Sequence, residues 1–89
     1  MKMGQVRWYG KIKPQSTYIV AHDPSLGTGG NYAAIEIIEL PSLKQIGEWQ
    51  NNVTPIQQQV KILREICKYI ETEQVAAGGS TSIYYSVEN

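Results

Sequence analysis

Two apolar, β-prone runs flank a glycine-rich turn near the start of the chain, and together they predict a hairpin. The first strand is Thr17–His22 and the second is Tyr32–Leu40. Pro24 ends the first strand because proline has no N–H to donate to a sheet. The small and φ-tolerant residues between positions 25 and 31 suit a reversal. The hairpin therefore holds the carboxylate of Asp23 at a strand tip beside a loop.

A third strand follows the hairpin after a short turn. Pro41 to Lys44 carries Pro and Ser where turns favour them, and Gln45–Asn51 then has Ile46 and Trp49 as its packing residues. Because both connections are short, we expect the three strands to run as an antiparallel meander.

The helical spacing of apolar residues predicts one helix from Pro55 to about Glu71. Thr54 suits the N-cap, Pro55 suits the first helical position, and Gln57 completes a capping box three residues after the cap. The apolar stripe consists of Ile56, Val60, Leu63, Cys67 and Ile70, widened by Ile62 and Ile66. Since Cys67 lies on this stripe, we expect it to pack in the core and not to act as a nucleophile.

A fourth strand, and the helix that leads to it, define the predicted fold. After an Ala- and Gly-rich loop from Thr72 to Ser80, Ser82–Val87 is β-prone. A strand, a helix and a returning strand usually form a right-handed crossover with parallel strands. The fourth strand is therefore expected beside the first and parallel to it. Counted along the chain, the strands take the order 3-2-1-4 in a mixed α/β sheet with the helix on one face.

The beginning of the chain, residues 1–16, is predicted to be a lead-in or linker segment before a domain at 17–89. It carries basic residues with Trp8 and Tyr9 between them, a mixture that can contact nucleic acid. It can also supply a short strand at Val6–Tyr9 or an arm whose Trp8 packs on the sheet. We favour the packed arrangement.

Composition limits the kinds of protein to consider. Eighty-nine residues make one small domain or part of a larger one, and the charges balance at 8 basic and 8 acidic residues. This balance gives no support for holding DNA by overall charge. A single cysteine excludes an internal disulfide and a Cys/His zinc spacing. No run approaches the roughly 20 apolar residues of a membrane span, and residues 1–14 contain no apolar segment of the kind that a signal peptide carries. We expect a soluble protein in a reducing compartment.

Two carboxylates are expected at one edge of this sheet. Asp23 ends the first strand and Glu88 ends the fourth, so parallel neighbouring strands would bring both to the same edge. Close carboxylates repel each other, and a divalent cation relieves the repulsion. Hard oxygen ligands suit Mg²⁺ or Mn²⁺, which support phosphoryl transfer. The alternative is ordinary turn chemistry for Asp23 and a solvated Glu88.

Three further features lie near this edge in the sequence: His22, the two glutamates of the second strand, and the glycine-rich turn. His22 precedes Asp23 and is expected to be a packed or solvated strand residue, although it could contact substrate. Glu36 and Glu39 point to opposite faces of their strand, and both are expected at the solvent or at an edge. The turn that contains Gly27–Gly30 resembles a phosphate-binding loop, but it is neither a Walker A sequence nor a dinucleotide fingerprint.

The run DPSLGTGGNYAAIEIIEL, residues 23–40, resembles the opening of the nuclease domain of bacteriophage large terminases, the motor proteins of DNA packaging. The later features follow in the order found in that family. They are a strand with Trp49 and Asn51, a helix that opens with Thr54-Pro55, and a strand that ends in Glu88-Asn89. The resemblance covers roughly residues 17–89.

The resemblance implies an RNase H-like fold and two-metal hydrolysis of phosphodiester bonds with Mg²⁺ or Mn²⁺. By position, Asp23 and Glu88 are the first and second metal-binding acids of that family. The intact parent would be an endonuclease that cuts concatemeric viral double-stranded DNA in the cytoplasm of the infected host. Its partners would be an ATPase domain, the portal and the small terminase.

The sequence also departs from the family. Asn31 stands where the family usually has Asp, and the family's third metal-binding acid would lie beyond Asn89. We therefore expect the 89-residue chain itself to be inactive, and to associate through an exposed edge formed by its last strand. Two alternatives stay open. One is a fragment of an ATPase of the actin and sugar-kinase type, and the other is a non-catalytic binding module.

Overall fold

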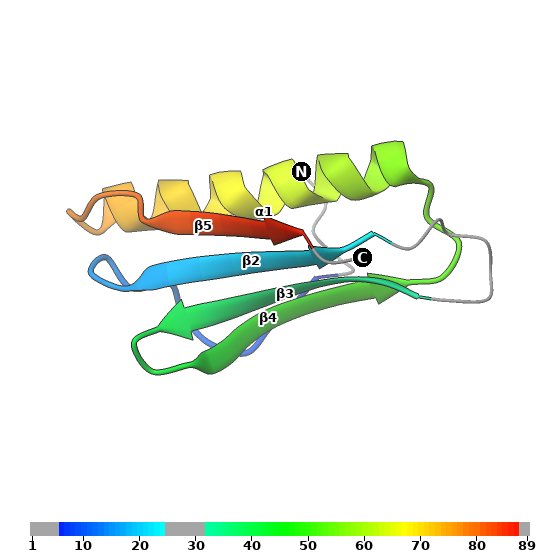
Figure 1. Cartoon of the computed structure of the whole chain (residues 1–89). Helices are drawn as coiled ribbons and strands as arrows, with labels where there is room; N and C mark the ends of the chain where they lie inside the picture. The colour runs from blue at the N-terminus through cyan, green and yellow to red at the C-terminus, as the bar shows by residue number, and fades with distance from the viewer. Residues whose placement is uncertain (1–5, 25–31, 88–89) are drawn as a thin grey trace.

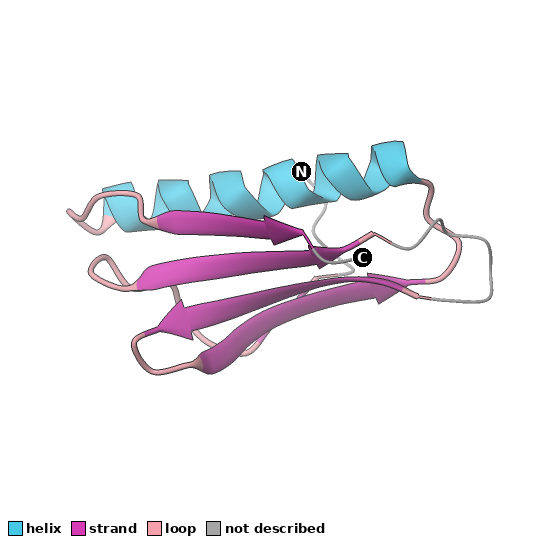
Figure 2. Cartoon of the chain, in the orientation of Figure 1, coloured by secondary structure: helices cyan, strands magenta, loops and turns pink. Residues whose placement is uncertain are grey.

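The computed structural model describes residues 6–24 and 32–87, which form one mixed sheet with one helix along one face (Figure 1, Figure 2). This arrangement confirms the α/β class. The elements are β1 (Arg7–Trp8), β2 (Thr17–Asp23), β3 (Ala33–Leu40), β4 (Lys44–Asn51), α1 (Ile56–Ala76) and β5 (Ile83–Val87).

The sheet has the strand order β1-β4-β3-β2-β5. β2, β3 and β4 pair antiparallel, while β5 returns from the helix and pairs parallel to β2. The sheet differs in detail from the predicted one because β1 joins it as a fifth strand, at the edge beside β4. In Figure 1 the arrows of β2, β4 and β5 end on the same side of the sheet, where α1 begins.

The lead-in segment joins the sheet through Trp8, which packs between β4 and α1. Gly47 on β4 lies opposite Trp8, and a Cβ atom at Gly47 would stand only 3.0 Å from the indole ring. On its other side Trp8 meets Tyr69 of α1, with ring centroids 4.8 Å apart. The packed arrangement of Trp8 is therefore confirmed.

The core lies between α1 and the sheet face that carries every second residue of the central strands. Tyr18 and Val20 of β2 and Ile35 and Ile37 of β3 are fully buried, and Trp49 of β4 is 1% exposed. Leu63, Ile66 and Ile70 of α1, which recur at helical spacing, pack against these strand residues. The alternate strand residues point to the opposite face, which is half-exposed.

The ends of α1 differ from the prediction. The helix continues to Ala76, five residues past Glu71, because Gln74 extends the buried spacing of the stripe. The predicted capping box is wrong: Pro55 occupies the N-cap position and no side chain caps the helix. The hydroxyl of Thr54 instead donates to Asn51 Oδ1 at 2.8 Å, which fixes the turn between β4 and α1.

Candidate metal centre at one end of the sheet

Asp23 is the last residue of β2 and its side chain is exposed. Strand alternation directs it to the face opposite α1, since its neighbour His22 is buried under the helix. Within residues 6–24 and 32–87, no hydrogen bond or ion pair to its carboxylate is found. In this part of the chain, no contact prevents the carboxylate from binding a ligand.

The second predicted acid, Glu88, lies outside the described residues, as do the turn residues 25–31 with the Gly27–Gly30 segment. The strand that leads to Glu88 is described. β5 runs parallel to β2, and the last pair of the register joins His22 to Val87. In the sequence, the residues that follow this pair are Asp23 and Glu88.

A metal-binding cluster of three or more His, Cys, Asp or Glu side chains is not found within the part of the chain that the structure describes. Asp23 is therefore one candidate ligand and not a finished site. A functional centre here needs further oxygen ligands beyond the described residues.

Behind Asp23, a chain of buried polar contacts joins β2 to its neighbours. His22 is 2% exposed; its Nδ1 lies 3.1 Å from the hydroxyl of Tyr85 on β5, and its Nε2 lies 3.0 Å from Oε1 of Gln59 on α1. Gln59 is fully buried and donates through Nε2 to the carbonyl of Thr54 at 2.8 Å. His22 thus packs inside, as predicted for a strand residue.

These contacts determine the tautomer of His22. The amide of Gln59 donates to a carbonyl, so its Oε1 can only accept, and His22 Nε2 must carry the proton. In the neutral ring, Nδ1 then accepts from the Tyr85 hydroxyl. The imidazole has a partner at both nitrogens and faces away from Asp23. It acts as a clamp that holds the tip of β2 to β5 and α1, and its packing supports no direct catalytic role.

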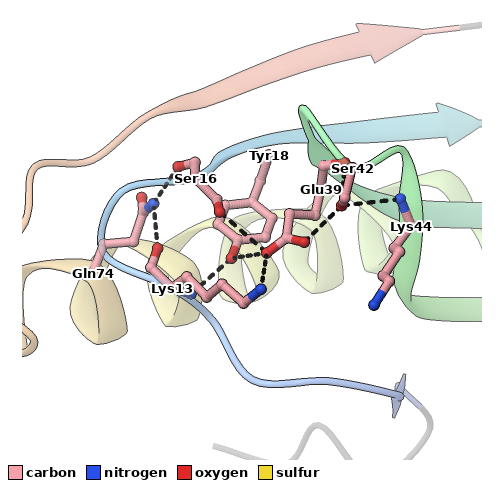
Figure 3. A network of polar contacts seen from close by, with 7 residues as sticks. All are labelled: Lys13, Ser16, Tyr18, Glu39, Ser42, Lys44 and Gln74. Carbon is pink, nitrogen blue, oxygen red and sulfur yellow. Dashed lines mark hydrogen bonds and ion pairs between the residues drawn. The ribbon is translucent and has the colours of Figure 1, made fainter.

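The carboxylate of Glu39 was expected at the solvent, and this expectation is wrong. Glu39 is 3% exposed and lies near the far end of β3, where it pairs with Tyr18 and Lys44. Figure 3 shows the hydroxyl groups that converge on it. Ser42 donates to Oε1 at 2.7 Å, while Ser16 and Tyr18 donate to Oε2 at 3.1 and 3.3 Å. Glu36, in contrast, is exposed as predicted.

The environment of Glu39 favours its charged form. The hydrogen bond from Ser42 lowers the pKa of Glu39 below its usual value of 4.5, against the opposing effect of burial, and Ser16 and Lys13 add to the lowering. The Lys13 ammonium stands 3.8 Å from Oε2. The oxygens of Glu39 already accept hydrogen bonds from the chain itself. Glu39 also lies at the end of the sheet opposite to Asp23, so the two acids cannot share a site.

Two glutamines with structural roles were not identified from the sequence. Gln59 joins the clamp, and Gln74 donates to the carbonyls of Lys13 and Ser16 and accepts from the N–H of Ser82. Both fall in phase with the buried residues of α1. A polar residue in phase with an apolar stripe was the available signal, because such a residue must find buried partners.

Cys67 packs against the core, as predicted, although one side remains partly exposed. Burial raises the pKa of its thiol, and the nearby carboxylate of Glu71 raises it further. The thiol is therefore held protonated, which disfavours nucleophilic chemistry.

Fold and site together define a small α/β domain with an exposed acid at the carboxyl end of a parallel strand pair. Comparison of the sequence with protein-family models and with curated proteins finds no match. Within the described residues, α1 is too polar to cross a membrane and no other helix is present.

Proposed function

We propose that this chain is the first part of an RNase H-like nuclease domain of the kind found in bacteriophage large terminases. In this proposal Asp23 and Glu88 are catalytic metal ligands, and the reaction is hydrolysis of phosphodiester bonds in double-stranded DNA. The observation that carries the proposal is the parallel register of β2 and β5, which reaches His22 and Val87, one residue short of both acids in the sequence.

The order of elements supports the RNase H-like assignment. Three antiparallel strands, a crossover helix and a strand parallel to the first are what the resemblance implies. Parallel neighbours present their carboxyl ends at one edge of a sheet, and sites in such sheets form at that edge. Asp23 stands at this edge, whereas the buried Glu39 stands at the opposite one.

The donors fit a hard divalent cation. Asp23 offers carboxylate oxygens at an exposed position, and Mg²⁺ and Mn²⁺ prefer such ligands together with water. When bound, two ions of this type activate a water molecule and stabilise the leaving 3′-oxygen. The role of the chain is to hold Asp23 at a fixed position, which the clamp of His22, Gln59 and Tyr85 accomplishes from behind.

The remaining elements of the proposal concern the parent protein. A third acid would come from outside these residues, so the 89-residue chain would bind metal weakly and cut no DNA. The parent would act on concatemeric viral DNA in the cytoplasm of the host, in company with an ATPase domain, the portal and the small terminase.

Thermal melting with and without Mn²⁺ tests the proposal. A cation that binds only the folded state adds about 1.4 kcal/mol at a concentration ten times its Kd. For a domain of this size, that energy raises Tm by about 8 °C. We expect this rise in the wild type and its loss in Asp23→Asn and in Glu88→Gln. Melting is followed by far-UV circular dichroism.

Glu73→Gln is the matched control, because it removes the same charge from an exposed position on α1. It should keep the full response to Mn²⁺. An unchanged Tm for the wild type at saturating Mn²⁺ contradicts the proposal, and so does an equal rise in Asp23→Asn. Stabilisation by ATP that survives Glu88→Gln would instead favour an ATPase of the actin and sugar-kinase type.

A further inference from the structure

The charged residues of α1 are not spread evenly along the helix. Its three basic residues are Lys61, Arg64 and Lys68, and all of them precede position 69. Two of its three acids, Glu71 and Glu73, follow that position. This order runs against the helix dipole, which favours acids in the first turn and bases in the last. The stability of the helix therefore does not explain the arrangement.

The three basic residues form one stripe along the helix. Spacings of three and four residues bring Lys61, Arg64 and Lys68 onto one side of α1. This basic stripe lies away from the buried residues of the helix, on the side where Arg64 and Lys68 also line a groove beside β5. Its position is set by the spacing within α1 and does not depend on the edge strand.

The cations of the basic stripe have no anionic partner in the part of the chain that the structure describes. All three side chains are exposed, and none forms an ion pair or a side-chain hydrogen bond with another described residue. Like charges three or four residues apart on a helix repel each other, and the stripe contains two such pairs. A bound polyanion would relieve this repulsion.

The basic stripe begins at the end of the sheet where Asp23 stands. Gln59 Oε1, two residues before Lys61, lies 3.0 Å from Nε2 of His22, and Asp23 is the next residue of β2. Figure 1 shows that α1 begins on the side where the arrows of β2 and β5 end. The first half of the helix therefore places its cations beside the candidate metal centre.

Other basic residues are less well placed for this centre. Lys13 and Lys44 lie at the opposite end of the sheet, beside Glu39. Arg7 lies on β1, three strands away from β2. The basic stripe of α1 is thus the group of cations that reaches the end of the sheet with Asp23.

We propose that the basic stripe binds the phosphate backbone of double-stranded DNA and so directs the duplex to the end of the sheet with Asp23. The inference rests on the proposed function, which supplies the kind of nucleic acid. Lys and Arg side chains neutralise phosphates and release condensed counterions, so this binding is independent of base sequence. Because the chain has a net charge of zero, the attraction comes from the stripe and not from the whole chain.

Fluorescence anisotropy of a labelled DNA duplex, titrated with the 89-residue chain in EDTA, tests this inference. Three phosphate contacts predict a slope of about −2.7 for the logarithm of the binding constant against the logarithm of the salt concentration. That slope makes binding roughly 40-fold weaker at about 200 mM salt than at about 50 mM. Lys61→Gln, Arg64→Gln and Lys68→Gln should each bring the slope closer to zero by about 0.9.

Lys44→Gln is the matched control, because it removes the same charge from an exposed position at the other end of the sheet. It should keep the full slope, and far-UV circular dichroism should show the same fold for every variant. A wild type that does not bind the duplex overturns the inference, and so does a slope that Lys44→Gln reduces as much as the stripe variants do. Competition by polyglutamate at an equal concentration of charge overturns the assignment to DNA.

The use of EDTA keeps this result separate from the response of Asp23 to Mn²⁺. A chain that responds to Mn²⁺ but does not bind the duplex contradicts the role of the basic stripe alone. A chain that binds the duplex through the stripe but does not respond to Mn²⁺ contradicts the nuclease proposal and supports the stripe.

Discussion

Two carboxylates at opposite ends of the sheet have opposite environments. Glu39 is buried, accepts hydrogen bonds from three hydroxyl groups and has the Lys13 ammonium nearby. Asp23 is exposed at a strand tip, and no partner for it is found within residues 6–24 and 32–87. The fold holds the first acid by three hydrogen bonds, whereas the described residues give the second none. Of these two acids, Asp23 is the one whose oxygens are open to a ligand within that part of the chain.

The environment of Glu39 also explains how the lead-in is held. Ser16 and Lys13 come from the segment before β2, and Gln74 fixes the carbonyls of both residues to the end of α1. Figure 3 shows these contacts as one connected network. Among the described residues, every buried side-chain nitrogen or oxygen has a hydrogen-bond partner. The network therefore satisfies the buried polar groups where the lead-in, β2, β3 and the end of α1 meet.

Replacing Glu39 should produce the largest difference between the two ends. Glu39→Ala removes the carboxylate that accepts hydrogen bonds from the hydroxyls of Ser16, Tyr18 and Ser42. We expect a loss of about 3 kcal/mol in the free energy of unfolding, measured by urea denaturation. Asp23→Ala, measured with EDTA present, should change it by less than about 0.5 kcal/mol. Equal effects of the two substitutions would show that the comparison between the carboxylates is wrong.

The sequence predicted the framework of the fold more completely than its polar interior. Apolar runs and helical spacing identified four strands, the helix and the parallel return. Glu39 follows Ile35 and Ile37 in phase, but Ala34 and Ile38 make the other face apolar too, so the strand alone did not show which face is buried. Two of the partners of Glu39 come from positions 16 and 18, which only the pairing of β2 with β3 brings near, although Ser42 stands just three residues along the chain.

The candidate site was predictable to a similar extent. Period and topology placed Asp23 at the carboxyl end of a strand parallel to β5, as the structure shows. The clamp behind it was harder to predict, because Gln59 is one of three consecutive glutamines and its partners lie on β2 and in the turn before α1. Thr54 matched a capping box, but the nearby Asn51 competes for its hydroxyl.

The pH dependence of stability should separate the buried acid from the exposed ones. The folded state lowers the pKa of Glu39, so its charged form stabilises the fold at pH values above the ordinary value of 4.5. That contribution is lost as the pH falls through the lowered pKa. We expect the stability difference between wild type and Glu39→Gln to stay constant from pH 7 to pH 5. Below about pH 4.5, the difference should shrink.

Urea denaturation at each pH, with Asp23→Asn as the matched control, measures this difference. The control removes a carboxylate that has no hydrogen-bond donor among the described residues, so its difference from wild type should stay close to zero across the range. A difference for Glu39→Gln that grows on acidification would contradict the assignment of Glu39 as a stabilising anion.

The smallest expected effect concerns the open face of the sheet, where Asp23 lies. Glu36 on β3 stands directly opposite Glu48 on β4, and like charges in such a cross-strand pair destabilise a sheet. Glu36→Gln should therefore stabilise the domain by about 0.5 kcal/mol at low ionic strength, and added salt should reduce this gain. The measurement is urea denaturation at two salt concentrations. A loss of stability would mean that Glu36, like Glu39, is held by partners of its own. The contrast between the buried Glu39 and the exposed carboxylates of the sheet would then no longer apply.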